Sequence, residues 1–350
     1  MCPIPSFLPW SDQNPSSRIS LRRATRISRL SQHLAEFPYL VAESLSALSF
    51  ACLSDDVVVQ FISIMKNRLW LLFAAVTTLC WGVWGAFIEL PEKAGFPATL
   101  GYSVWALTMV PCSLFALWFV GWKCEHDRRS VLLGFVIGSL GAGGQLLLFE
   151  ALRTGPAYMV FPIVSLYPVL TVLLSLWRLK ERASRRAWIG IGFSVPAMVM
   201  LSWQQPADPA GSARLWLPLA LLVFVGWGLQ AYVMKFATGS MRAESIFFYM
   251  AVSGVALIPI ALMMTDFSRP IQWGLRGPYL AAAVQVLNSI GALCLVYALR
   301  HGKAIIVVPM TALAPVITIA LSLVFYRVIP GGVLVAGMVS AALAIYFMAE

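Results

Sequence analysis

A few polar side chains interrupt long apolar runs, and they are the first candidates for chemistry in this sequence. Glu150 stands between Phe149 and Ala151, near the end of one such run. An acidic residue at the centre of a membrane helix costs about 2.5–3.5 kcal/mol on insertion scales, so its presence needs a reason. Two interpretations stay open. Glu150 binds a proton or balances a cationic substrate, or it forms an ion pair with Arg153, three residues further along the same helix.

Amide side chains form a second group of candidates. Gln285 and Asn288 are three residues apart and share one face of a helix, whereas Gln145 and Gln230 stand alone. Amides inside a bilayer usually bond to neighbouring helices, with about 0.6 kcal/mol gained per bond in one membrane protein. The alternative is direct hydrogen bonding to a polar substrate. The sequence favours the substrate for the Gln285–Asn288 face and interhelical bonding for each amide taken alone.

Aromatic residues and one threonine complete the set of cavity candidates. They are Trp81, Trp84, Trp227, Tyr158, Tyr167 and Thr311. The three tryptophans lie well inside their apolar runs, where the interfacial aromatic belt explains them poorly. They would line a cavity, whose aromatic faces also suit cations, or pack against the neighbouring glycines.

Paired prolines mark two segments that resemble each other. Residues 151–171 and residues 298–318 are 147 positions apart, and eleven of their twenty-one aligned positions are identical. The shared residues include two prolines per copy: Pro162 and Pro168, then Pro309 and Pro315. Proline removes a backbone donor and clashes with the carbonyl four residues earlier. We expect helix breaks or hinges at these sites, with freed carbonyls facing a cavity, or simple kinks.

The composition requires a bilayer around most of the chain. Of the 350 residues, 60% are hydrophobic and 11% are charged, whereas soluble domains are about 25% charged. The net charge of +10 does not indicate nucleic acid, because the Lys and Arg lie in short clusters between apolar runs. The six Cys show no C-x-x-C pair, and the His residues lack metal-ligand spacing, so neither a disulfide framework nor a metal site is predicted.

Ten apolar runs are close to the roughly 20 residues that a helix needs to cross a bilayer. They cover residues 69–88, 99–121, 131–152, 156–177, 187–203, 214–235, 244–265, 278–299, 303–326 and 331–348. Backbone polar groups must be satisfied inside a bilayer, so these runs are predicted to be helices. Residues 1–64 are predicted to be a poorly ordered arm, as a targeting segment or as an upstream extension from a start assigned too early.

The positive charges predict the orientation. With the N-terminus inside, the inner loops hold Lys66, Arg68, Lys123, Arg128, Arg129, Arg178, Lys180, Arg182, Arg185, Arg186, Lys235, Arg242, Arg300 and Lys303. The outer loops hold fewer: Lys93, Arg153, Arg214, Arg269, Arg276 and Arg327. Positive residues favour the cytoplasmic side, so both termini are predicted to be cytoplasmic, in a bacterial inner membrane.

The duplication extends to a five-helix unit. Trp81-Gly82 in the first span matches Trp227-Gly228 in the sixth, 146 positions later. We therefore predict one five-helix unit in residues 65–203 and a second in 204–350. Because five is odd, the second unit crosses the membrane upside down relative to the first. Inverted repeats are typical of secondary carriers.

These features together resemble the EamA-type members of the drug/metabolite transporter superfamily. The resemblance covers about residues 66–349. It rests on the doubled five-helix unit, the Trp-Gly pairs, the A-L-x-x-G-x-A entry to a proline-containing fourth helix, and Glu181 after that helix. The second unit has Val328 where the first has Glu181, so the role of that acid is not symmetric. The resemblance implies secondary transport of small metabolites through a cavity lined by spans one, three, four, six, eight and nine.

No enzyme signature accompanies these spans. The sequence has no G-x-x-x-x-G-K-[ST], H-E-x-x-H or G-x-S-x-G motif, so we expect no enzymatic activity and no cofactor. The expected partners are a small-molecule substrate, the lipid bilayer and a coupling proton or ion. Two alternatives stay open: a sensor or scaffold without transport activity, and a lipid-modifying enzyme. Substrate, direction, coupling ion and oligomeric state stay open as well.

Overall fold

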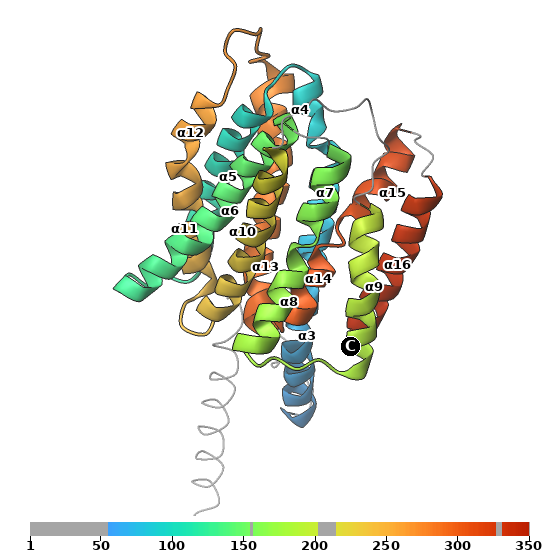
Figure 1. Ribbon diagram of the computed structural model, residues 1–350. Coiled ribbons are helices and arrows are strands. Elements are labelled where there is room, and N and C mark those ends of the chain that lie inside the picture. Colours follow the sequence, from blue (N-terminus) through green and yellow to red (C-terminus); the bar gives the residue numbers. More distant parts are fainter. Residues whose placement is uncertain (1–54, 155–156, 202–214, 327–330, 350) are drawn as a thin grey trace, which may run out of the picture. The chain divides into compact units, whose positions relative to one another are not determined.

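The computed structural model describes residues 55–154, 157–201, 215–326 and 331–349 (Figure 1). The chain divides into two compact units, residues 1–66 and 67–350. In the first unit the described residues, 55–66, are helical. The described residues of the second unit form helices and connecting loops, without a strand.

Fifteen elements follow one another along the described residues. They are α3 (Asp55–Phe87), α4 (Glu89–Lys93), α5 (Ala98–Phe119), α6 (Arg128–Thr154), α7 (Ala157–Ser165), α8 (Tyr167–Arg178), α9 (Arg185–Leu201), α10 (Trp216–Ala237), α11 (Ala243–Ala256), α12 (Ile258–Met263), the π-helical turn η1 (Leu275–Tyr279), α13 (Leu280–His301), α14 (Ala304–Thr311), α15 (Pro315–Tyr326) and α16 (Gly332–Met348). Asp55 is the first described residue, and residues 55–64 are helical; residues 1–54 of the expected N-terminal arm lie outside the described residues, and the arm stays a prediction.

Seven helical stretches in the described part of the chain are long and apolar enough to cross a membrane. They are Arg68–Lys93, Ala98–Phe119, Arg128–Thr154, Trp216–Ala237, Ala243–Met263, Leu275–His301 and Ala304–Leu321. The other three predicted spans correspond to shorter apolar helices: Ile163–Arg178, α9 and α16. The all-helical membrane fold is confirmed, while the count of ten crossings stays a prediction.

Two helices are interrupted between the paired prolines. Helix α7 ends at Ser165 and α8 begins at Tyr167, with Leu166 between them at φ −80° and ψ 0°. Pro168 occupies the first turn of α8, where its missing N–H has no helical partner to lose. The second interruption separates α14, which contains Pro309, from α15, which begins at Pro315. The two breaks fall at matching positions of the repeated segments.

Close crossings between helices explain several of the glycines. The Trp81 ring of α3 lies on Gly291 of α13, where an added Cβ would approach the indole nitrogen to 2.6 Å. The Trp227 ring of α10 lies on Gly144 of α6, where the same distance would be 2.5 Å. The two contacts are exchanged copies, because the repeat spacing matches Trp81 with Trp227 and Gly144 with Gly291.

Hydrogen bonds repeat the same exchange. Trp81 Nε1 donates to the Asn288 carbonyl (3.4 Å), and Trp227 Nε1 donates to the carbonyl of its counterpart, Gly141 (3.3 Å).

The threonines of the fourth and ninth predicted spans form another exchanged pair. Thr171 Oγ1 donates to the Gly228 carbonyl (2.9 Å), and Thr318 Oγ1 donates to the Gly82 carbonyl (2.8 Å). Helices of one half thus pack against the other half through reciprocal contacts.

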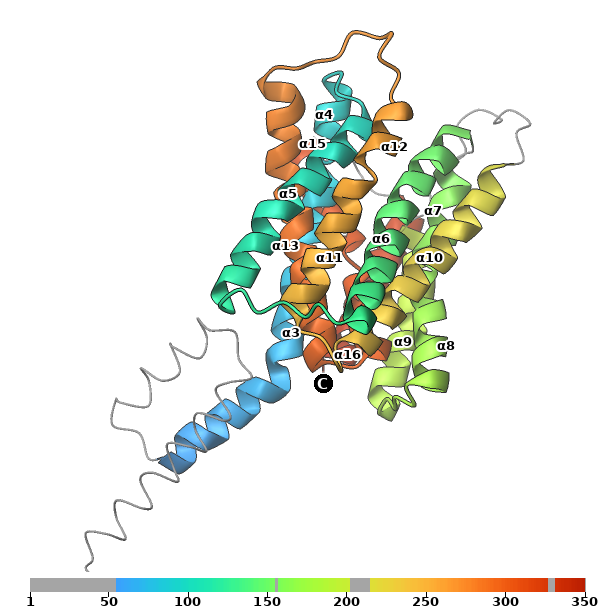
Figure 2. The ribbon, with the colours of Figure 1, turned by 90° about the vertical axis from the view of Figure 1, so that its left-hand side faces the viewer.

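The last helices of the two halves, α9 and α16, also cross closely, through one glycine on each helix. In α9, Gly190 lies against Met348 of α16, at 2.6 Å from an added Cβ to the Met348 Cγ. In α16, Gly337 lies against Met200 of α9, at 3.0 Å from an added Cβ to the Met200 Cβ. Figures 1 and 2 show that α9 and α16 run in opposite directions, as do α10 and the part of α3 after Asn67.

Asp127 sets the start of α6. Its Oδ2 accepts the backbone N–H of Ser130 (3.1 Å), and its carbonyl accepts the N–H of Val131 (3.0 Å). This arrangement caps the helix N-terminus. Hydrogen bonds from Ser130 hold the pKa of the Asp127 carboxyl below its ordinary value. The cap is therefore complete at neutral pH.

Candidate functional site

The predicted site residues lie on six of the expected spans. Trp81 and Trp84 are on α3, Gln145 and Glu150 on α6, Tyr158 on α7, Tyr167 on α8, Trp227 and Gln230 on α10, Gln285 and Asn288 on α13, and Thr311 on α14. The structure brings some of them together and separates others. The side chains of Tyr158 and Pro162 lie outside the described part of the chain.

Gln285 is buried and bonded at both ends of its amide. Its Oε1 accepts the indole N–H of Trp84 (3.0 Å), and its Nε2 donates to the Gly101 carbonyl (3.4 Å). With 5% of its surface exposed, this side chain joins α3 and α5 to α13. The geometry matches interhelical bonding rather than a group held free for a ligand.

The other three amides differ from Gln285. Gln145, Gln230 and Asn288 are partly exposed, and none of their side chains has a hydrogen-bonding partner among the described residues. The amide of Gln230 lies over Gly141, in the space that a Cβ would occupy. The two predicted partners therefore differ: the amide of Gln285 is bonded at both ends, whereas the side chain of Asn288 has donors and an acceptor available for a ligand.

Glu150 is paired within its own helix. Its two carboxylate oxygens accept from Arg153 Nε (2.9 Å) and from the terminal guanidinium nitrogen Nη2 (2.6 Å). The side chain of Arg153 is 73% exposed and that of Glu150 is 30% exposed. Exposed pairs of this kind add little to stability, because water screens the attraction. The geometry matches the ion-pair interpretation, and a coupling role for Glu150 stays a prediction.

Three of the other candidates have partners inside the protein. The Tyr167 ring stands edge-on to Trp227, with centroids 5.9 Å apart. Thr311 is fully buried, and its Oγ1 lies 3.1 Å from the carbonyls of Val307 and Val308 in its own helix. Thr311 therefore satisfies its hydroxyl locally, whereas Tyr167 and Trp227 form an aromatic wall between α8 and α10.

The prolines of the repeated segments border an apolar cavity. Pro168 and Pro309 contribute to a space of about 180 Å³ that α8, α9 and α14 enclose, together with Ile191 and Met198. Among the described residues, no charged group lines this cavity. Bending at the adjacent helix breaks would change the volume of this cavity. The hinge role of these prolines stays a prediction.

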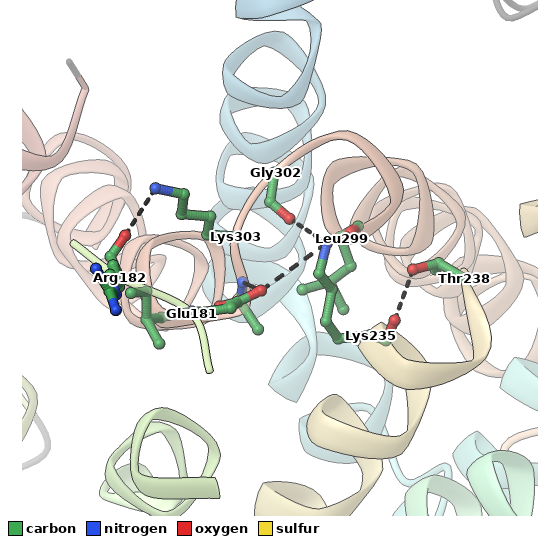
Figure 3. A network of polar contacts seen from close by, with 9 residues as sticks. Glu181, Arg182, Lys235, Thr238, Leu299, Gly302 and Lys303 are labelled. Atoms are coloured by element: carbon green, nitrogen blue, oxygen red, sulfur yellow. Dashed lines mark hydrogen bonds and ion pairs between the residues drawn. The ribbon is translucent and has the colours of Figure 1, made fainter. Parts of the chain in front are cut away.

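A polar cluster lies where α8, α10, α13 and α14 end or begin (Figure 3), and the sequence singled out only its Glu181, as part of the family resemblance. Glu181 Oε1 accepts the N–H of Ala304 and its Oε2 accepts the N–H of Ile305, both at 3.1 Å. Lys235 Nζ donates to the carbonyls of Leu299 and Gly302, both at 2.7 Å.

The same cluster borders a cavity of about 340 Å³. Leu179, Glu181, Lys235, Phe236, Thr238, Gly239 and Arg300 line it. The Lys235 Nζ and Glu181 Oε1 atoms are 4.0 Å apart. The role of Lys235 could have been predicted from the sequence. It is a lone cation at the end of an apolar helix, and cations there are stabilised by carbonyl groups at helix C-termini.

A second buried acid, Glu244, had no sequence signal. It is 6% exposed in the first turn of α11 and accepts a hydrogen bond from the Tyr297 hydroxyl. The Phe73 ring stacks on Tyr297 with centroids 4.9 Å apart. The 147-residue repeat spacing matches Tyr297 with Glu150, but it could not reveal the contact with Glu244, because Glu244 lies on a different helix.

Comparisons with known proteins agree with the helical arrangement. The profile of the EamA-like transporter family matches twice, at residues 68–203 and 214–349. Protein LicB of Haemophilus influenzae is 24% identical over 211 residues, which are 57% of this chain and 70% of LicB. The uncharacterized protein MJ1333.1 of Methanocaldococcus jannaschii is 33% identical over 109 residues, which are 31% of this chain and 77% of that protein.

A solved structure, described only as the crystal structure of a protein, has the same fold. It aligns with a TM-score of 0.67 at 17% identity, and the alignment covers 80% of this chain and 96% of that one. This likeness concerns the fold alone.

Proposed function

The chain belongs to the EamA-like transporter family, and from that premise we propose that it is a secondary transporter of small metabolites. It would expose one central site to the two sides of a membrane in turn. Family membership supports an integral membrane transporter in general. The mechanism and the site rest on the contacts described above.

The reciprocal contacts between the two halves carry the proposal. Trp81 on Gly291 and Trp227 on Gly144 are one contact in two copies, as are the Thr171 and Thr318 bonds. Equivalent contacts in two halves give them two exchangeable arrangements of similar energy. The opposite directions of matching helices support an inverted repeat, which is the arrangement that lets a carrier alternate between two faces.

Ten crossings complete this topology. The seven long helices would be joined by three shorter crossings, formed by α7 with α8, by α9 and by α16. Each half would then contribute five crossings. The charge distribution supports cytoplasmic termini in a bacterial inner membrane, and in that orientation Glu181 and Lys235 would lie at the cytoplasmic face.

The substrate site would lie between the helices that exchange contacts. Asn288, Gln230 and Gln145 supply amides with unused bonding capacity, and Trp227 with Tyr167 supplies an aromatic wall. Uncharged amides beside aromatic rings suit a small polar molecule with an apolar part. The helix breaks between the paired prolines would let the halves rock about this site.

Ligand-induced stabilisation tests the proposed function. Purified protein is heated with each member of a panel of amino acids, sugars, nucleosides and amines, and every stabilising compound is then tested for counterflow in proteoliposomes. Ligand bound to the folded state alone raises stability by RT ln(1 + [L]/Kd), so a compound at 100 times its Kd adds about 2.7 kcal/mol. We expect a stabilising compound that also shows saturable counterflow.

Two variants separate the site from the scaffold. Asn288→Ala should abolish the ligand-induced shift and leave the unliganded melting temperature unchanged. Gln285→Ala should lower the unliganded melting temperature, because Trp84 loses its acceptor. Stabilisation without counterflow would favour the alternative of a sensor or scaffold. A covalently altered panel compound would favour the lipid-modifying or other enzyme.

A further inference from the structure

Glu181 holds the beginning of α14 by both of its carboxylate oxygens. Oε1 accepts the N–H of Ala304 and Oε2 accepts the N–H of Ile305, both at 3.1 Å; these are the first two residues of the helix. No side chain of the helix itself caps this N-terminus. A carboxylate at a helix N-terminus is favoured by unsatisfied N–H groups and by the helix dipole. The acid comes from the segment after α8, so the bond joins the two regions that match the family profile.

Lys235 holds the end of the preceding helix in the same way. Its ammonium group donates to the carbonyls of Leu299 and Gly302, at the C-terminus of α13, at 2.7 Å each. The side chain is 21% exposed, and that of Glu181 is 10% exposed. The short connection between α13 and α14 is thus held by a cation on one side and an anion on the other, each against the helix end of suitable polarity.

A third hydrogen bond attaches the α13–α14 connection to the segment after α8. Lys303 Nζ donates to the carbonyl of Arg182 (2.7 Å), directly after Glu181 in the chain (Figure 3). We call three sets of contacts the latch: those of Glu181 with the start of α14, those of Lys235 with the end of α13, and that of Lys303, within the connection, with Arg182. Two of its three side chains, Glu181 and Lys303, form bonds that join the first matched region to the second.

We propose that the latch is the gate that holds this face of the transporter closed. The proposal rests on the proposed function, because it gives the latch a place in the alternating cycle. Helix α14 is buried along nearly its whole length and is separated from α15 by the proline-flanked break. Rocking of one half against the other must carry α14 away from the segment after α8. Glu181 must release both N–H groups when this face opens.

The residues at the repeat positions of Glu181 and Lys235 cannot form a second latch. The 147-residue spacing matches Glu181 with Val328, and the 146-residue spacing matches Lys235 with Glu89. A valine cannot accept the N–H groups of a helix, and a glutamate cannot donate to carbonyls. The gate therefore acts at one face, and it breaks the balance between two otherwise equivalent arrangements in favour of the state closed at this face.

Distances between spin labels test the gate without a substrate. Labels are attached to cysteines introduced at Arg185 and Ser240, exposed positions in the two matched regions, after the native cysteines are replaced by alanine. In liposomes the protein should give one dominant distance. Glu181→Ala should add a longer distance and raise the open-to-closed ratio about tenfold or more, the change expected for losing one charge-assisted hydrogen bond.

Glu181→Gln provides the second variant, because its amide oxygen keeps one acceptor and should give a smaller shift in the same direction. Glu89→Gln is the control, since Glu89 pairs with Lys93 in an exposed turn at 2.6 Å, and it should leave the distances unchanged.

Folding, label distances and counterflow are measured separately for each variant, so that their outcomes can be told apart. Unchanged distances in folded, monodisperse Glu181→Ala and Glu181→Gln proteins would overturn the gate, as would an equal shift in Glu89→Gln. A shift in Glu181→Gln supports the gate even if the alanine variant fails to fold. If the wild type transports and the distances do not move, only the gate is wrong. If the distances move and the wild type shows no counterflow, the latch controls a conformational change and the proposed function is wrong.

Discussion

Gly144→Val and Gly291→Val should each destabilise the protein by about 1–3 kcal/mol or more, as overpacking does in well-packed interiors. At each position an added Cβ would come within 2.6 Å of a tryptophan indole, Trp227 or Trp81. Each indole is also held by a hydrogen bond to the glycine-bearing helix, so it cannot turn aside without losing that bond. The two variants should cost similar amounts, because the two contacts are copies. The measurement is the midpoint of thermal unfolding in detergent.

Gly143→Val is the matched control. Gly143 precedes Gly144 in the same helix, and an added Cβ there meets nothing within 4 Å. This variant should keep the wild-type midpoint or exceed it, because glycine is a poor helix former. Equal losses at positions 143 and 144 would contradict the proposed crossing of α6 and α10. An effect at position 144 without one at 291 would contradict the equivalence of the two halves.

Lys235→Glu should cost about 2–5 kcal/mol, the range for removing one member of a largely buried charge pair; Lys235 and Glu181 lie 4.0 Å apart, and each is hydrogen-bonded to backbone groups. The substitution removes the donors to Leu299 and Gly302 and places a second carboxylate beside Glu181. The C-terminus of α13 would then face a carboxylate instead of an ammonium group. The new carboxylate would also repel Glu181, which binds the N-terminus of α14. Unfolding in detergent and the proportion of monodisperse protein report the loss.

Lys93→Glu makes the same chemical change where the pair is exposed. Lys93 and Glu89 are both 67% exposed in the short helix α4. Exposed pairs contribute about 1 kcal/mol or less, so this variant should differ little from the wild type. A loss at Lys93 as large as that at Lys235 would show that net charge, rather than the geometry around Lys235, determines the effect.

The fold was predictable because membrane helices leave a strong pattern in a sequence. Apolar length and the doubled Trp-Gly and proline motifs led to the family and to the all-helical fold. The breaks at Leu166 and after Thr311 also have local causes, since both lie between prolines that the repeat shares. Residues 55–64 are helical and continue into the first apolar run, because no proline or glycine separates the two segments.

The site was less predictable because its contacts join distant segments. The spacing of Gln285 and Asn288 gave a common face but could not reveal that Trp84 and Gly101 occupy only Gln285. The partners of Glu181 are backbone groups more than a hundred residues away, which carry no side-chain signature. Glu150 stood out because its helix is apolar, yet its partner was the nearest arginine.

Labelling of a cysteine at position 288 from each side of the membrane tests the central claim most directly. Asn288→Cys, in a protein with its native cysteines replaced by alanine, is placed in right-side-out and in inverted vesicles and exposed to a membrane-impermeant maleimide. Alternating access predicts labelling from both sides, with Glu181→Ala increasing the rate from the face that carries the latch. Labelling from one side alone, or from neither side, in folded protein would contradict a site that opens to each face in turn.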